Sequence, residues 1–210
     1  MSAKIMSVTE ADPHAFSAVE EPAVAVRDER RGLLAVAGSR GYGVPAPVAV
    51  YETSDLSCRL LVHSRFPVHA MAFHPALPLL ALGTGRYDGG YFFEGELLLL
   101  NLQSSENRSL IEHEIGRQVL ELEWVDEHAL RILMAPPDDW QDKRARLEGH
   151  VVVVHRDDWA SVPARSLTGR DLAGPRLPAP RPNGHEAARQ MLAEVSAAWR
   201  VQSAGHSTDL

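Results

Sequence analysis

An internal repeat constrains the fold of this chain more than any other feature of its sequence. Three segments follow one plan, and they span residues 23–52, 68–102 and 118–156. Each begins with an alternating run, passes through a short polar turn into a more apolar run, and reaches another apolar run after a connection that contains glycine or proline. Phe73 and Trp124 hold the same place in the second and third segments. Such a repeat predicts a stack of similar units.

The repeated runs predict β-strands. They are short, rich in Val, Leu and Ile, and bounded by turn residues, which is typical of strands and not of helices. Along residues 68–73 and again along 119–124, neighbouring side chains alternate as the two faces of a pleated strand require. The expected fold class is therefore all-β, with units of four strands.

The second segment resembles a blade of the WD-repeat β-propeller family. Phe73-His74-Pro75 matches the family's aromatic turn, 79–83 its second strand, and 97–102 its third strand. The third strands of the three units end in "VYE", "LNL" and "VHR" where the family has Trp-Asp. The resemblance extends over residues 22–160 and implies a partial β-propeller of about three four-stranded blades. Their expected bounds are near 22–65, 66–116 and 117–160.

The count of blades predicts association. A propeller normally closes with about four to eight blades, and this chain supplies three recognisable units at most. An open stack would expose apolar rows at its two ends, among them Val151 and Val153, which is unusual for a soluble monomer. We therefore expect self-association or a protein partner, with a homo-oligomer favoured over a hetero-complex. The N-terminal segment and the Pro-rich arm are an alternative cover for the ends.

The segments that flank the repeats differ from them in composition and in expected secondary structure. Residues 1–21 form an N-terminal segment that can add a strand, and 161–183 form a Pro-rich linker or arm, because its prolines block helix and central strand alike. Residues 184–201 predict an amphipathic helix, followed by a disordered tail at 202–210. Its apolar stripe needs a cover, so three of its residues are expected to contact the body or a partner: Met191, Val195 and Trp199.

Charge and cysteine content indicate which partners and which cellular compartment to expect. The formal net charge of -7 provides no basic stripe for nucleic acid or anionic lipid. The single Cys58 rules out an intrachain disulfide, and the first residues lack the pattern of a secretory signal. No apolar run is long enough for a membrane span. We expect a cytoplasmic protein that binds neither nucleic acid nor a membrane.

The acidic, glycine-rich stretch at 86–96 is the alternative site of chemistry. Asp88, Glu94 and Glu96 could bind a ligand or metal, but they lack the regular offsets of a calcium loop, and the glycines favour a turn between strands. The His69/His74 and His150/His155 pairs have an odd spacing that sends strand side chains to opposite faces. No metal site, catalytic residue or cofactor is therefore expected.

These observations favour a non-enzymatic interaction scaffold, or a subunit of a larger assembly. Trp140 lies in the connection between the second and third strands of the last unit, where an exposed tryptophan is a candidate partner contact. The alternative is an accessory or catalytic subunit of an enzyme that uses the stretch at 86–96.

Overall fold

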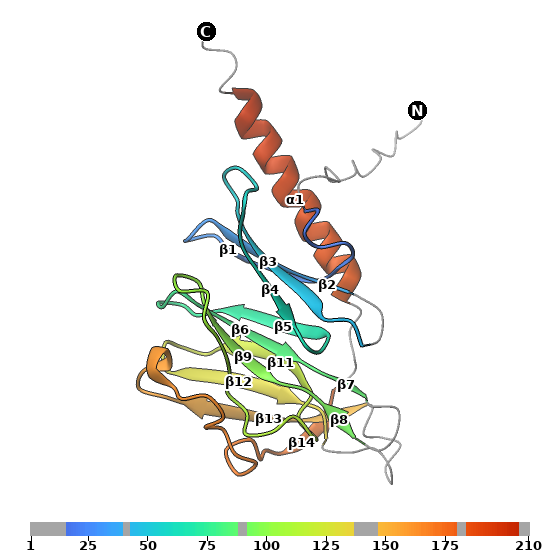
Figure 1. Cartoon of the computed structure of the whole chain (residues 1–210), viewed down its shortest axis with the longest axis vertical. Helices are drawn as coiled ribbons and strands as arrows, with labels where there is room; N and C mark the ends of the chain where they lie inside the picture. Colours follow the sequence, from blue (N-terminus) through green and yellow to red (C-terminus); the bar gives the residue numbers. More distant parts are fainter. Residues whose placement is uncertain (1–15, 40–42, 88–91, 137–146, 180–183, 206–210) are drawn as a thin grey trace, which may run out of the picture.

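The computed structural model describes residues 16–39, 43–87, 92–136, 147–179 and 184–205. These residues form four antiparallel sheets and one helix, α1 (Gly184–Gly205). Three sheets have four strands each and stack in chain order, with α1 against the first of them (Figure 1). The prediction of an all-β body with one C-terminal helix is confirmed at this level.

Each large sheet places its first strand at one end of the strand order. The first sheet has the order β1-β2-β3-β4, the second β10-β9-β6-β5 and the third β11-β12-β13-β14, while β7 and β8 form a separate two-stranded sheet. The strands are β1 (Pro22–Asp28), β2 (Leu33–Gly38), β3 (Ala46–Glu52), β4 (Cys58–Ser64), β5 (Val68–Phe73), β6 (Leu79–Thr84), β7 (Arg86–Tyr87), β8 (Phe93–Glu94), β9 (Leu97–Asn101), β10 (Asn107–Ser109), β11 (Val119–Trp124), β12 (Ala129–Met134), β13 (Glu148–His155) and β14 (Arg176–Pro178).

The inner strands are apolar on both faces because other layers cover both faces. Every residue of β2 and of β6 is buried. Neighbouring residues of β6 serve different cores: Leu80 packs toward the first sheet and Leu79 toward the third. Val36 and Ala49 of the first sheet pack instead with α1. The continuous apolar runs thus follow from stacking, whereas an end strand such as β11 alternates.

The three first strands share an irregularity of pairing. In each of them, the second residue of the strand has no partner in the register with the neighbouring strand. The shift lies between Pro22 and Val24 in β1, between Val68 and Ala70 in β5, and between Val119 and Glu121 in β11. β5 lies beside both β1 and β11. The register therefore relates the units residue by residue, and Val26, Ala72 and Glu123 hold equivalent places.

The structure differs from the sequence-based boundaries in two places. The fourth strand of the last sheet, β14, comes from the Pro-rich 161–183 segment, since an end strand tolerates proline on its unpaired side. Helix α1 continues to Gly205, so 202–205 are helical where a disordered tail was expected. Of the N-terminal segment, residues 16–21 form a turn, with Phe16 and Val19 buried against the first sheet, and the rest, in which a strand could be added, lies outside the described residues.

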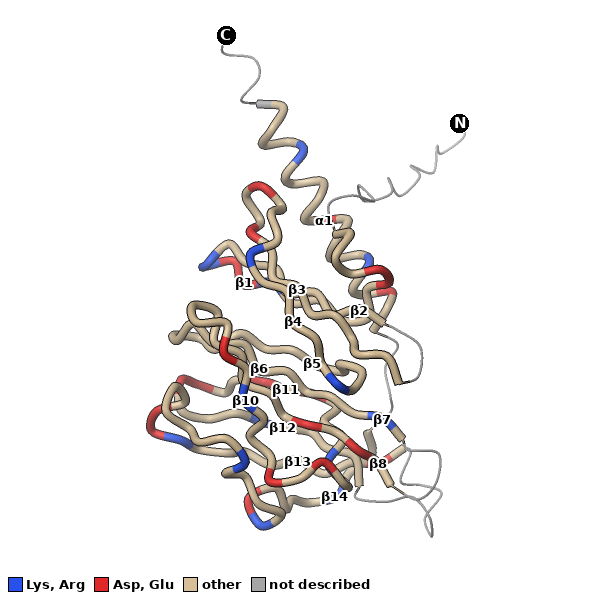
Figure 2. The backbone as a smooth tube through the Cα atoms, viewed as in Figure 1, with Lys and Arg blue, Asp and Glu red and all other residues tan. Residues whose placement is uncertain are grey.

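The two ends of the stack are covered differently. Helix α1 covers the outer face of the first sheet. The outer face of the third sheet carries Arg131, within 4 Å of Glu121 and Glu123, beside Val153, which is 42% exposed. Acidic and basic residues are interspersed along the sheets (Figure 2). In the part of the chain described, no helix is long and apolar enough to span a membrane.

Candidate interaction site between the first and second sheets

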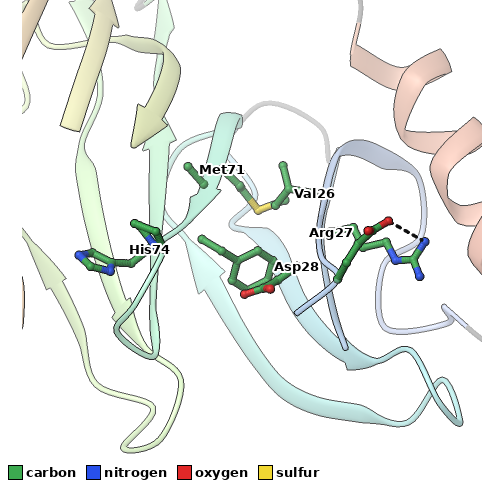
Figure 3. Close-up of a pocket in the computed structure, with 9 residues that line it drawn as sticks. Val26, Arg27, Asp28, Met71 and His74 are labelled. Atoms are coloured by element: carbon green, nitrogen blue, oxygen red, sulfur yellow. Dashed lines mark ion pairs between the residues drawn. The ribbon is translucent and has the colours of Figure 1, made fainter. Parts of the chain in front are cut away.

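A groove opens where the first strands of the first two sheets lie side by side. It has a volume of about 350 Å³ and is called the β1/β5 groove below. The residues that line it are Val26, Arg27, Asp28, Glu29, Met71, Ala72, Phe73, His74 and Pro75. Met71 and Val26 point toward one another across the gap, whereas His74 points away toward the third sheet (Figure 3). Apolar and charged residues therefore line the groove together.

Polar contacts hold the rim of the groove. The Arg31 guanidinium pairs with the Asp28 carboxylate and donates to the His74 carbonyl at 2.7 Å and to the Leu77 carbonyl at 2.8 Å. Arg30 donates to the Pro75 carbonyl. The turn after β1 is thus attached to the turn after β5, which keeps the two strands at a constant separation beside the groove.

The corresponding place between the second and third sheets is filled by aromatic rings. Trp124 Nε1 donates to the Ala72 carbonyl at 3.1 Å, and its ring lies 4.5 Å from the His74 ring. Trp159, fully buried, meets Trp124 edge to face at 4.9 Å and donates to the His128 carbonyl at 3.0 Å. This junction has a closed aromatic core where the first junction has a groove.

His74 acts as a structural residue at this junction. It is 1% exposed, and its Nδ1 accepts the backbone N–H groups of Ala76 and Leu77 at 3.0 and 2.9 Å. Its Nε2 donates to the Glu127 carbonyl at 3.0 Å. Burial lowers the pKa of His74, and the nearby Arg31 charge acts in the same direction. The ring is neutral and ties two turns together, so it offers no free nitrogen to a ligand.

The described parts of the acidic stretch at 86–96 pair with one another as strands β7 and β8. The Glu94 carboxylate accepts from Arg86 Nε at 3.0 Å. Gly95 lies so close to its neighbours that a Cβ there would be 2.2 Å from the Thr84 carbonyl oxygen. Asp88 lies outside the described residues. Of the three predicted ligand residues, the structure therefore places two: Glu94 at the end of β8, and Glu96 in the tightly packed link between β8 and β9.

Glu96 is the partly buried carboxylate of this stretch. Burial raises its pKa, while a hydrogen bond from Ser109 and the charge of Arg65 act in the opposite direction. Arg65 itself pairs with Glu114 at 3.1 Å. Among the residues that the structure describes, no three His, Cys, Asp or Glu side chains converge to hold a metal ion.

The predicted partner-binding residues of the helix lie against the body of the molecule. Val195 is buried, and Met191 and Trp199 are partly buried, all packed against the outer face of the first sheet. His185 Nδ1 also donates to the Pro22 carbonyl at 3.0 Å, which attaches the start of α1 to β1. Trp140 lies outside the described residues.

The sequence did not point to the groove. Its lining comes from two strands more than 40 residues apart, and Val26, Met71 and Phe73 are ordinary core residues by pattern. No motif or period in the sequence marks a space between these two strands. No protein-family model matches the chain, and no curated protein matches it.

Proposed function

We propose that this protein is a non-enzymatic interaction module that binds an extended segment of a protein partner in the β1/β5 groove. The observation that carries the proposal is the groove itself, about 350 Å³, lined by apolar residues of β1 and β5 together with the charged side chains of Arg27, Asp28 and Glu29. A concave site between two strands, with both apolar and polar groups in its lining, suits a side chain of a bound peptide.

The position of the groove supports a peptide more than a small molecule. β1 and β5 are the end strands of their sheets. End strands offer backbone N–H and C=O groups to an added strand, while pockets for alternate side chains provide specificity. Burying one large apolar side chain contributes about 1.5–3 kcal/mol. The strand edges and the groove between them together therefore match the two requirements of peptide binding.

The same geometry supports a fold assignment finer than stacked sheets. We infer that the three large sheets are blades of a WD-repeat-like β-propeller. Each unit is a four-stranded antiparallel sheet, the first strands lie side by side, and each carries the same pairing irregularity. Propellers arrange the first strands of their blades around a central channel in this way. The groove then lies between two neighbouring blades.

Selection of peptides tests the function. A library of random linear peptides displayed on phage is selected on the immobilised full chain, and enriched peptides are synthesised and titrated. Val26→Phe fills the groove from β1 and is expected to weaken the selected peptides at least tenfold, or about 1.4 kcal/mol. Val153→Phe makes the same change on the outer face of the third sheet and is expected to leave binding unchanged.

Two results would contradict the function. One is a library that yields no peptide for which the groove variant and the control variant differ. The other is a chemical activity of the full chain that Glu94→Ala and Glu96→Ala abolish without unfolding, which would favour an enzyme subunit that uses the 86–96 stretch. Circular dichroism of each variant establishes that the fold is intact.

A further inference from the structure

The connection between β13 and β14 crosses from the third sheet to the second. It spans residues 156–175 and is called the strap below. Near its start, the guanidinium of Arg108 on β10 donates to the carbonyls of Ala160 and Val162 at 2.7 and 2.8 Å. Trp159, also in the strap, is fully buried in the core that the second and third sheets share. The strap therefore starts and ends in the third sheet but is held by the end strand of the second.

The middle of the strap pairs with the second sheet through its backbone. Leu167 pairs with Ile111 in parallel. Its N–H donates to the Leu110 carbonyl at 2.8 Å, and its carbonyl accepts from the Glu112 N–H at 2.9 Å. The Leu167 side chain is fully buried in the core that the second and third sheets share. Backbone hydrogen bonds and core packing therefore join these two sheets through the strap.

The junction between the first and second sheets is held in a different way. Side chains provide its polar contacts, because Arg30 and Arg31 donate to carbonyls of the turn after β5. In the described part of the chain, no backbone N–H of one of these two sheets donates to a backbone carbonyl of the other. The β1/β5 groove also opens at this junction. One junction is thus tied through the backbone, and the other through side chains alone.

From this difference we propose that the molecule opens as two cooperative units. The first unit consists of β1 to β4 with α1, which share a core, and the second consists of the second and third sheets, locked together by the strap. Proteins open locally in such units, and a unit held by fewer buried contacts and backbone hydrogen bonds opens at a lower free energy. The first unit therefore opens more readily, and the boundary between the units lies at the β1/β5 groove.

Native-state hydrogen exchange of the full chain tests the division. Exchange is followed by mass spectrometry at a series of urea concentrations below the unfolding transition. β2 and β6 provide a matched comparison, because both are inner strands in which every residue is buried. We expect the amides of β2 to exchange together with those of α1, and about tenfold faster than those of β6. The amides of β6 should in turn exchange together with those of β12 in the third sheet.

Variants of the strap and of the core beside it test what the strap does. Leu167→Ala removes the buried side chain of the strap and is expected to make β12 exchange faster than β6, so that the second unit divides. If Leu167→Ala does not fold, Arg108→Met provides the same test, because it removes the side-chain bonds to the strap. Leu99→Ala is the control, since Leu99 is buried in the same core but lies on β9. It is expected to speed exchange in β6 and β12 alike.

Three outcomes would overturn the inference. Exchange of β2 and β6 at one common free energy, or exchange of α1 that is independent of β2, would remove the division into two units. Strap variants that change β6 and β12 as equally as Leu99→Ala does would remove the role of the strap. These measurements use the chain without a partner, so their failure is distinct from failure of the proposed interaction function.

Discussion

His74 is one of two histidines, with His150, through which pH should act on stability, because burial lowers the pKa of both. The pKa of His74 is lowered in the folded state by burial, and protonation of Nδ1 would displace the N–H groups of Ala76 and Leu77. Because its pKa is lower in the folded state than in the unfolded state, His74 binds a proton more readily when the chain is unfolded. Its contribution to stability is present above about pH 6.5, the ordinary pKa of histidine, and is lost as the pH falls below it.

We therefore predict that the free energy of unfolding decreases from pH 7.5 to pH 5.5, and that His74→Asn decreases less. Asparagine can accept the same turn N–H groups but does not titrate. Urea denaturation at a series of pH values measures the difference. His63→Asn, at an exposed position on β4, should retain the wild-type dependence. Identical profiles for the wild type and His74→Asn would assign the pH dependence to other groups.

Gly95 permits the close packing of the 86–96 stretch. A Cβ at this position would lie 2.2 Å from the Thr84 carbonyl oxygen and 2.8 Å from that of Arg117, and both are backbone atoms that cannot rotate away. Gly95→Ala is predicted to lower the free energy of unfolding by about 1–3 kcal/mol, the usual range for overpacking. At Gly169 the nearest atom is the end of the flexible Arg117 side chain, so Gly169→Ala should cost much less. Thermal denaturation of the two variants compares them.

At the scale of elements, α1 completes the core of the first sheet. Leu192 and Val195 are buried, and Trp199 lies half-buried beside the same cluster. Trp199→Ala should therefore lower the free energy of unfolding by about 1–3 kcal/mol, somewhat less than for a fully buried aromatic. Val201→Ala is the control, because Val201 is 74% exposed and should change stability by under about 0.5 kcal/mol. Equal effects of the two substitutions in urea denaturation would show that the helix is loosely attached.

The whole molecule bears on the expectation of self-association. That expectation assumed uncovered apolar faces at both ends of an open stack. α1 covers one end, and at the other the ion pairs of Arg131 lie beside Val153 on a mixed surface. Among the described residues, the two ends of the stack therefore give no reason of this kind to expect self-association. Hetero-association through the β1/β5 groove does not depend on it.

We accordingly predict that the isolated chain has the mass of one copy across a dilution series, measured by light scattering. Truncation after residue 182 removes α1 and exposes the outer face of the first sheet, so the truncated chain should bind an apolar dye and associate. A concentration-dependent dimer of the full chain would restore self-association as the way in which the stack is completed. Unchanged mass and dye binding after truncation would contradict the covering role of α1.

The sequence by itself determined the local structure. Apolar and polar residues alternate along 68–73 and 119–124, and short apolar runs lie between turn residues. This pattern predicts strands, because side chains on a pleated strand change face at every residue. The apolar stripe that includes Leu192 and Val195 likewise predicts a helix with one buried face. These periods are properties of neighbouring residues, so they can be read along the chain.

The tertiary structure alone decided which surfaces meet. Whether α1 covers its own sheet or a partner depends on the free energy of long-range packing. The apolar stripe in the sequence of the helix is the same in either case. The 161–183 segment likewise contributes β14 only because an end strand accepts proline where β13 offers a partner. The β1/β5 groove is lined by residues of two strands that belong to different sheets. A space between side chains from distant strands exists only once those strands are packed, and no period in the sequence encodes it.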